Sequence, residues 1–339
     1  MKFKFLHLLI FVPVFTLIII VSGFVWYNNN LSAPTTNEET TRVVITRGAS
    51  TEKIASTLSE AGVIKNAFVF RLYTQLNNQT RNIPAGQFDI PQNLSVSEVI
   101  AKLRRGPTQL WVTVPEGLRR EEYPDKIIES LGLSGTTAEE FRQEFIEASR
   151  NLEGYLFPDT YLFPPEVTAT TIVQTMRNTF DQKFPVSEQN KLEALGLTLG
   201  EGVSLASILE RETITDEERP VVAGILYNRL NIDMPLQVDA SVQYAVASNC
   251  QLLSSVQKCE WWPKGLTRDQ INNTNSPYNT YQHTGIPPAP IANPGLSSLM
   301  AVANPEESDY FYYIHANGQI YYAEDLAGHN ANVARYLNK

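Results

Sequence analysis

Two glutamates within residues 202–230, Glu210 and Glu212, have the setting best suited to chemistry in this sequence. Glu210 falls on the same helical stripe as Val203 and Ala206, which are small and apolar, so a substrate has room beside its carboxyl group. Partial burial raises the pKa of a carboxyl group toward the working pH, as a general acid requires. The pattern therefore makes Glu210 a candidate general acid, and a solvated or paired helix glutamate is the alternative.

Glu212 has a different setting. It lies seven residues beyond Leu205 and falls on the same side of the helix as the large apolar residues of the predicted core stripe. A carboxylate on that side needs a partner when it is buried. We expect Glu212 to be a buried structural carboxylate, paired with an arginine such as Arg219 or Arg229.

Other reaction classes find no support in the sequence. It contains no G-x-S-x-G, P-loop, G-x-G-x-x-G or H-E-x-x-H motif. Two cysteines and four scattered histidines give no ligand set for a metal ion, so we expect neither a metal nor a cofactor. With 27 basic against 36 acidic residues, the net charge is −9, which disfavours a nucleic-acid partner. Carboxylates remain as the candidates for catalysis.

Two later segments carry groups that suit a sugar-binding cleft. Gln237 and Asp239 are two residues apart in a stretch predicted to be extended, so their side chains point to one face. Residues 276–295 are dense in Tyr, Asn, Gln and Pro. Aromatic faces and amides on rigid loops can stack on sugar rings and hydrogen-bond to hydroxyl groups. For any single residue here, a proline-stiffened loop packed on the core is an equally good interpretation.

Cys250 and Cys259 enclose eight residues and are followed by Trp261 and Trp262. In an oxidising compartment a disulfide between the two cysteines is the default expectation. A free reactive thiol is the alternative, and it is disfavoured because no histidine is near in sequence.

The N-terminal residues predict a membrane anchor. Residues 5–27 contain no Asp, Glu, Lys or Arg, and about 20 helical apolar residues cross a bilayer core. Lysines precede this run and the first charges after it are acidic, so residues 1–4 are expected in the cytoplasm and the rest outside. A cleaved signal peptide is the alternative, but the run exceeds the usual length of roughly 7–15 residues. Residues 28–41 are polar and are expected to form a flexible tether.

Residues 42–109 are predicted to form a small β-α-α-β module. A β-branched strand leads to a turn at Gly48, and Ser50 can cap the helix that follows. Ser95 and Glu98 have the spacing of a capping box that opens another helix. Small modules of this kind resemble LysM-type carbohydrate-binding units, and a simple spacer domain is the alternative.

A second strand, glycine turn and helix follow the module. The turn is at Gly117, and Pro124 either kinks the following helix or begins it. Residues 137–193 have mostly helical patterns, and Asn317-Gly318 predicts a β-hairpin turn near the C-terminus. The overall fold class is therefore α+β.

Several motifs, taken together and in order, resemble the YceG-like family of membrane-anchored endolytic murein transglycosylases. They are the apolar N-terminal run, VTVPEG, LEGYLFPDTY, LASILERET, LQVDASVQY, SPYNTY and GIPPAPIANPG. The resemblance implies a lyase that cleaves the β-1,4 bond between N-acetylmuramic acid and N-acetylglucosamine inside a peptidoglycan strand. The product is a 1,6-anhydro-muramic end, and the reaction would terminate nascent strands.

The resemblance also implies roles for individual residues. Glu210 matches the first acid of the family's E-x-E pair and is implied to be the catalytic glutamate. It would protonate the leaving oxygen and then, as carboxylate, take the proton of the C6 hydroxyl that attacks the anomeric carbon. The positions implied to line the cleft are Glu153, Gln237, Asp239, Tyr278, Asn279 and Tyr281.

These features together predict the organisation and surroundings of the protein. We expect a bacterial inner-membrane protein whose catalytic domain lies outside the cytoplasm. Its partners would be peptidoglycan strands and, by the resemblance, wall synthases (penicillin-binding proteins). The expected parts are a cytoplasmic N-terminus (1–4), a transmembrane helix (5–27), a tether (28–41), a LysM-like module (42–109) and a mixed α+β catalytic domain (110–339).

Two other hypotheses stay open. In the first, Glu153 or Asp239 activates water, which would make the protein a muramidase-type hydrolase of the same bond. In the second, the protein is a membrane-tethered glycan-binding protein without catalytic activity.

Overall fold

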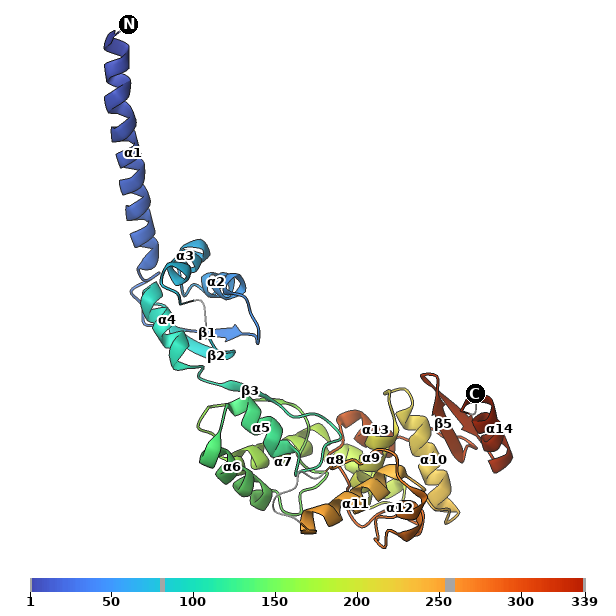
Figure 1. Ribbon diagram of the computed structural model, residues 1–339. Helices are drawn as coiled ribbons and strands as arrows, with labels where there is room; N and C mark the ends of the chain where they lie inside the picture. The colour runs from blue at the N-terminus through green and yellow to red at the C-terminus, as the bar shows by residue number, and fades with distance from the viewer. Residues whose placement is uncertain (1, 80–82, 254–259, 338–339) are drawn as a thin grey trace. The chain divides into compact units, whose positions relative to one another are not determined.

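The computed structural model describes residues 2–79, 83–253 and 260–337 (Figure 1). Helices dominate, and the described strands pair into three two-stranded sheets, β1 with β2, β3 with β4, and β5 with β6. The mixture of helices and small sheets agrees with the predicted α+β class.

The chain forms two compact units, each with its own buried apolar cluster. The first unit comprises Met1–Val112 and Leu162–Glu166, and the second comprises Thr113–Tyr161 and Val167–Lys339. The first seven elements of the chain are α1 (Lys2–Leu31), β1 (Thr40–Ile45), α2 (Thr51–Glu60), α3 (Ala67–Leu76), β2 (Gly86–Pro91), α4 (Val96–Arg105) and β3 (Leu110–Thr113).

Helix α1 is long and apolar enough to cross a membrane, over the window Val14–Leu31. Because it ends at Leu31, it includes the first four residues of the segment predicted to be a tether, Asn28–Leu31. Leu31 packs against the apolar cluster of the first unit. The helix is therefore compatible with a single-pass anchor. The flexible segment between this helix and the module is shorter than the polar composition of residues 28–41 suggests.

The module after α1 is built from locally encoded elements. Strands β1 and β2 pair antiparallel, with Val43 opposite Phe88, and both side chains are buried. The Ser50 hydroxyl accepts a hydrogen bond from the amide of the third residue of α2, as predicted from its N-cap position. Ser95 and Glu98 form the predicted capping box at the start of α4. Strands and helices enclose a common apolar core.

The second unit is mainly helical. Pro124 lies in the first turn of α5, so of the two predicted alternatives the proline begins the helix. The elements after β3 are α5 (Tyr123–Leu131), α6 (Gly135–Ala148), β4 (Thr160–Phe163), α7 (Ala169–Lys183), α8 (Val186–Ala194), α9 (Leu199–Glu212), α10 (Arg219–Asn231), α11 (Asp239–Leu253), α12 (Arg268–Asn273), α13 (Leu296–Ala303), β5 (Tyr312–Ala316), β6 (Gln319–Ala323) and α14 (Leu326–Tyr336).

Helix α9 lies at the centre of this unit. A capping box between Thr198 and Glu201 starts it, and every residue from Gly202 to Leu209 is buried. Helices α13, α8, α10 and α11 all contact it. The first and last turns of α9 lie at the edge of this core, and the last turn carries the two glutamates that the sequence singles out.

The C-terminal elements close the unit. Strands β5 and β6 form an antiparallel hairpin, and both residues of the predicted turn, Asn317 and Gly318, have positive φ angles of 54° and 72°. Helix α14 packs on this hairpin (Figure 1). A side chain at Gly224 of α10 would overlap the backbone carbonyl of Glu306, so glycine allows the segment before β5 to lie directly on α10.

Candidate active site

The two glutamates of α9 point in different directions because residues two apart on an α-helix are separated by about 200°. Glu210 faces α13 and the start of α10, whereas Glu212, the last residue of the helix, faces strand β5. Their chemical environments are therefore independent, although they are two residues apart.

Glu210 is held by three donors. The Arg219 Nη2 atom lies 3.2 Å from Oε1, and the amide of Gly295 and the Ser298 hydroxyl donate to Oε2 at 3.0 and 2.7 Å. The Glu210 side chain is only 7% exposed. Burial and the neighbouring negative charge of Glu210 raise the pKa of Glu116 beside it. Both oxygens of Glu210 are therefore engaged, Oε1 by Arg219 and Oε2 by the two donors of α13.

Among the residues that the structure describes, the direct hydrogen-bond donor to Glu212 is the Tyr313 hydroxyl, at 2.7 Å from Oε2. Burial raises the pKa of Glu212, and the hydrogen bond from Tyr313 and the charge of Arg229 offset part of this rise. A carboxyl group with a raised pKa keeps its proton closer to neutral pH, which is the property of a general acid.

The expected pairing of Glu212 with an arginine is wrong. Arg219 forms its ion pairs with Glu210 and Asp216. The Arg229 guanidinium donates to the backbone carbonyls of Phe311 and Leu236, at 2.7 and 2.6 Å. Its charge acts on Glu212 only from a distance. The carbonyl groups that bind Arg229 lie in the loop before β5 and in the segment before α11. Helical periodicity in α9 and α10 gives no information about such distant partners.

A polar pocket of about 370 Å³ opens beside Glu212. It brings together three residues that the sequence predicted for the cleft, Gln237, Asp239 and Tyr281. The Tyr281 hydroxyl donates to Asp239 Oδ1 at 2.7 Å, which fixes both side chains. The complete lining is Glu212, Arg229, Leu236, Gln237, Asp239, Tyr281, Tyr312, Tyr313, Leu326 and His329.

The wall formed by the C-terminal hairpin and α14 was not predicted from the sequence. It consists of Tyr312, Tyr313, Leu326 and His329. The only signal for it is the aromatic density around β5, which equally suits an ordinary half-buried hairpin. The Tyr312 and His329 ring centroids lie 5.2 Å apart at the pocket, with the ring planes tilted by 35°, and aromatic faces of this kind can stack on sugar rings.

Three other predicted cleft residues lie outside this pocket's lining. Asn279 is fully buried, and its side-chain amide donates to the carbonyls of Ile271 and Thr274 at 2.9 and 3.1 Å, so it braces its own loop. Tyr278 packs against Tyr244, with ring centroids 4.8 Å apart. Both residues hold the loop that carries Tyr281.

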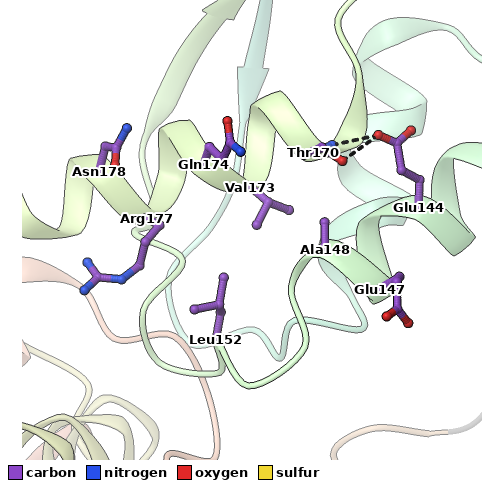
Figure 2. A pocket seen from close by; sticks show the side chains of 9 residues that line it. All are labelled: Glu144, Glu147, Ala148, Leu152, Thr170, Val173, Gln174, Arg177 and Asn178. Atoms are coloured by element: carbon purple, nitrogen blue, oxygen red, sulfur yellow. Dashed lines mark hydrogen bonds between the residues drawn. The ribbon is translucent and has the colours of Figure 1, made fainter.

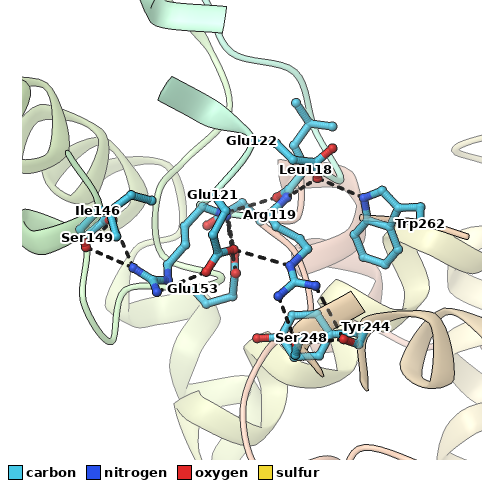
Figure 3. A network of polar contacts seen from close by, with 12 residues as sticks. Leu118, Arg119, Glu121, Glu122, Ile146, Ser149, Glu153, Tyr244, Ser248 and Trp262 are labelled. Carbon is cyan, nitrogen blue, oxygen red and sulfur yellow. Dashed lines mark hydrogen bonds and ion pairs between the residues drawn. The ribbon is translucent and has the colours of Figure 1, made fainter. Parts of the chain in front are cut away.

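Glu153, the third of these residues, belongs to a buried polar network (Figure 3). Its carboxylate accepts hydrogen bonds from the Arg120 amide at 3.0 Å and the Asn293 side chain at 2.8 Å. Burial, and then the nearby charge of Glu121, raise the pKa of Glu153 to about 8.

The same network anchors the two tryptophans that follow the cysteine segment. Trp262 donates to Glu122 at 2.9 Å (Figure 3). The Arg119 guanidinium lies 4.0 Å from the Tyr244 ring and 4.8 Å from the Trp261 ring. The predicted disulfide cannot be placed, because Cys259 and the side chain of Cys250 lie outside the described residues.

A second cavity, of about 400 Å³, lies between α6 and α7 (Figure 2). Its charged side chains have partners within the chain. Glu144 accepts bonds from the amide and hydroxyl of Thr170 at 3.0 and 2.7 Å, and Arg177 pairs with Asp181 at 2.5 Å. We assign no function to this cavity. Among the described residues, no cluster of three His, Cys, Asp or Glu side chains could hold a metal ion.

Comparisons with known proteins agree with this architecture. A protein of Bacillus subtilis strain 168 named endolytic murein transglycosylase is 29% identical, over 94% of this chain and 92% of its own length. A protein of the same name from Streptococcus pneumoniae R6 is 28% identical over 87% of this chain. The match spans 58% of the length of that relative.

A 2.6 Å crystal structure of a yceG-like protein from Listeria monocytogenes is also similar, with a TM-score of 0.58 and 29% sequence identity. The match covers 87% of this chain and 99% of that one. The sequence pattern of the YceG-like family matches residues 43–335, which is most of the chain. This protein therefore belongs to the YceG-like family.

Proposed function

We propose that this protein is an endolytic murein transglycosylase, a lyase that cuts the β-1,4 bond between N-acetylmuramic acid and N-acetylglucosamine within a glycan strand. The relatives that carry this name align with 87–94% of the chain. The observation that carries the proposal is the pocket beside Glu212, where a carboxyl group with a raised pKa meets polar and aromatic side chains. Acid, hydrogen-bonding groups and a stacking surface are what glycosidic cleavage requires.

Glu212 is the acid that the geometry favours. It lines the pocket together with Gln237, Asp239 and Tyr281, and in the described part of the chain the Tyr313 hydroxyl is its one side-chain donor. Glu210, which the sequence resemblance suggested, has both oxygens occupied by Arg219 and α13. Its catalytic role remains a prediction, and the contacts of Glu210 support a structural role in joining α9 to α10 and α13.

The reaction needs only one carboxyl group. Because Tyr313 donates to Oε2, the proton of the neutral acid belongs on Oε1 of Glu212. Oε1 gives that proton to the glycosidic oxygen as its bond to C1 of the muramic acid breaks. The carboxylate then takes the proton of the C6 hydroxyl, and O6 bonds to C1 to close the 1,6-anhydro ring. The nucleophile belongs to the substrate and is already near C1, so no water and no second carboxylate are consumed.

Asp239 is suited to a supporting role. Its carboxylate faces the same pocket and is oriented by Tyr281. A fixed negative charge there would stabilise the positive charge that develops at C1. The same residue would serve as base in a hydrolase, so the products decide between the two reactions.

We further propose the setting in which the enzyme acts. Helix α1 would be a retained single-pass anchor with residues 1–4 in the cytoplasm, and residues 110–339 would form the catalytic domain outside it. Residues 42–109 would be a LysM-like module that binds glycan. Cleavage at that membrane would terminate nascent strands beside their synthases. The apolar run of α1 and the strand–helix order of the module support these assignments.

The test is product analysis of purified murein digested by the full chain in detergent micelles. Mass spectrometry should find strands ending in 1,6-anhydro-muramic acid. Reducing ends, heavier by one water, would establish a hydrolase instead. Binding to murein without any cleavage, on nascent uncrosslinked strands as well as mature ones, would establish a glycan-binding protein and refute the enzymatic proposal.

A further inference from the structure

Helix α3 carries an apolar stripe that the core of the first unit leaves exposed. Phe68 and Leu76 are 54% and 67% exposed, and Leu72 between them is half-buried. At a spacing of four residues these side chains lie along one side of the helix. Phe70 and Thr74, on the opposite side, are fully buried. The helix therefore has two apolar sides, one packed in the core of the first unit and one exposed on its surface.

The start of α3 is fastened to the end of α1. The ammonium group of Lys65, just before the N-cap of α3, donates to the Asn29 carbonyl at 3.0 Å and to the Ser32 hydroxyl at 2.8 Å. Leu31 packs on the core of the same unit. In Figure 1, α3 lies beside the end of α1 from which the chain enters the module. We call these contacts of Lys65 and Leu31, which hold the end of α1 to the start of α3, the joint.

The position of this joint along α1 fixes its height above a bilayer. Tryptophan favours the membrane–water interface, so Trp26 marks where α1 would leave the apolar layer. Asn29 lies three residues further, about 4.5 Å along the helix axis. The headgroup layer on each side of a bilayer is roughly 5–8 Å thick. Lys65 and the start of α3 therefore fall within that layer.

We propose that the stripe formed by Phe68, Leu72 and Leu76 lies in the headgroup layer of the bilayer that α1 enters. The proposal rests on the proposed membrane anchoring of α1. Interfacial helices bury an apolar face by about 5–10 Å at this depth and keep cationic groups beside it. Arg71 has this arrangement, since its guanidinium carbon lies 6.0 Å from the centre of the Phe68 ring and its charge is paired with Glu52.

A lipid surface suits the stripe better than a protein partner because the joint with α1 already brings it to the membrane. The consequence is that the first unit is seated on the bilayer in one orientation. It would not swing at the end of a tether of fourteen residues, as the polar composition of residues 28–41 alone suggests.

The test uses the full chain in lipid nanodiscs that contain nitroxide-labelled lipids. An environment-sensitive fluorescent amino acid is incorporated singly by amber suppression, at Phe68 or Leu76. Position Trp26 reports on the anchor, and Val44, which is 40% exposed on β1, is the matched control. We expect several-fold stronger quenching at Phe68 and Leu76 than at Val44. Lys65→Ala should reduce the quenching at Leu76, because it removes both bonds to the end of α1.

The outcomes separate the two layers of the proposal. Quenching at Trp26 together with equally weak quenching at Phe68, Leu76 and Val44 would overturn the docking of α3 and leave the anchor intact. Absence of quenching at Trp26 would overturn the anchor and the docking with it. Protection of Phe68 that depends on protein concentration, without lipid quenching, would identify a second copy of the chain as the occupant and refute the lipid assignment.

Discussion

Replacing Tyr313 by phenylalanine should shift the pH dependence of murein cleavage to higher pH. The Tyr313 hydroxyl donates to Glu212 at 2.7 Å, and this bond lowers a pKa that burial has raised. Phenylalanine keeps the ring and removes the bond. Hydrogen bonds to charged groups contribute about 1.5–3 kcal/mol, and one pKa unit corresponds to about 1.4 kcal/mol. The pKa of Glu212 should therefore rise by about 1–2 units at most, and by less where water replaces the hydroxyl.

The sign of the effect follows from the role of Glu212. A general acid works only in its protonated form, so activity is lost as the pH rises through its pKa. A higher pKa moves this loss to higher pH. The assay is kcat/KM for the release of soluble fragments from murein, measured across the pH range, since this parameter reports ionisation in the free enzyme. Tyr310→Phe is the control, because Tyr310 stacks on Tyr322 instead.

A basic limb that stays in place or moves to lower pH in Tyr313→Phe would refute this reasoning. It would mean that the group whose deprotonation stops the reaction is not Glu212. A fall in rate at every pH with an unmoved limb would refute the reasoning in the same way and would leave Tyr313 a purely structural role.

Further predictions concern the scaffold. Gly224→Ala should lower the free energy of unfolding by about 1–3 kcal/mol, because the new methyl group overlaps a backbone carbonyl. Gly200→Ala, in a helical position where the new methyl group meets only ordinary van der Waals contacts, should stabilise by up to about 1 kcal/mol in the same urea titration. In the wild type, the raised pKa of Glu153 contributes stability that is complete below about pH 4.5 and is lost as the pH rises to about 8. Glu153→Gln should abolish this pH dependence in thermal unfolding, and an unchanged slope would contradict the assignment. Ser298→Ala removes the 2.7 Å bond to Glu210 and should cost about 1–3 kcal/mol of stability while cleavage persists.

The sequence predicted the features that neighbouring residues determine. The cap at Ser50, the capping box between Ser95 and Glu98 and the Asn317-Gly318 turn all have the expected local contacts. Each depends on residues within one turn of helix or one hairpin, so composition and spacing suffice. The predicted core side of α9 is buried, but every residue from Gly202 to Leu209 is buried as well, so the period alone did not show that the helix is enclosed on all sides.

The partners of the two glutamates could not be predicted by the same means. Glu212 receives its hydrogen bond from Tyr313, 101 residues later, and Glu210 from Ser298, 88 residues later. Periodicity assigned Glu212 to the core side of α9 correctly, but it could not reveal that this side opens into a pocket at the end of the helix. Which carboxyl group meets the substrate is a property of tertiary packing.

At the boundary between anchor and module, the sequence predicted flexibility where the structure has ordered contacts. Residues 28–30 are asparagines and only Leu31 is apolar, so composition alone predicts a flexible tether. Instead, α1 extends through these residues, and Lys65 holds its end to the module through hydrogen bonds to Asn29 and Ser32. A lysine more than thirty residues away supplies the information that the local sequence lacks.

The most direct test of the central claim compares Glu212→Gln with Glu210→Gln in murein cleavage by the full chain. Both variants should first be confirmed as folded, because Glu210→Gln removes one of the two charge partners of the buried Arg219 and leaves Asp216. We predict that Glu212→Gln lowers the rate by about 10²–10⁴-fold, the usual contribution of a general acid. Glu210→Gln should keep most of the activity of its folded fraction. Full activity in Glu212→Gln, with loss confined to Glu210→Gln, would contradict the account and return the catalytic role to Glu210.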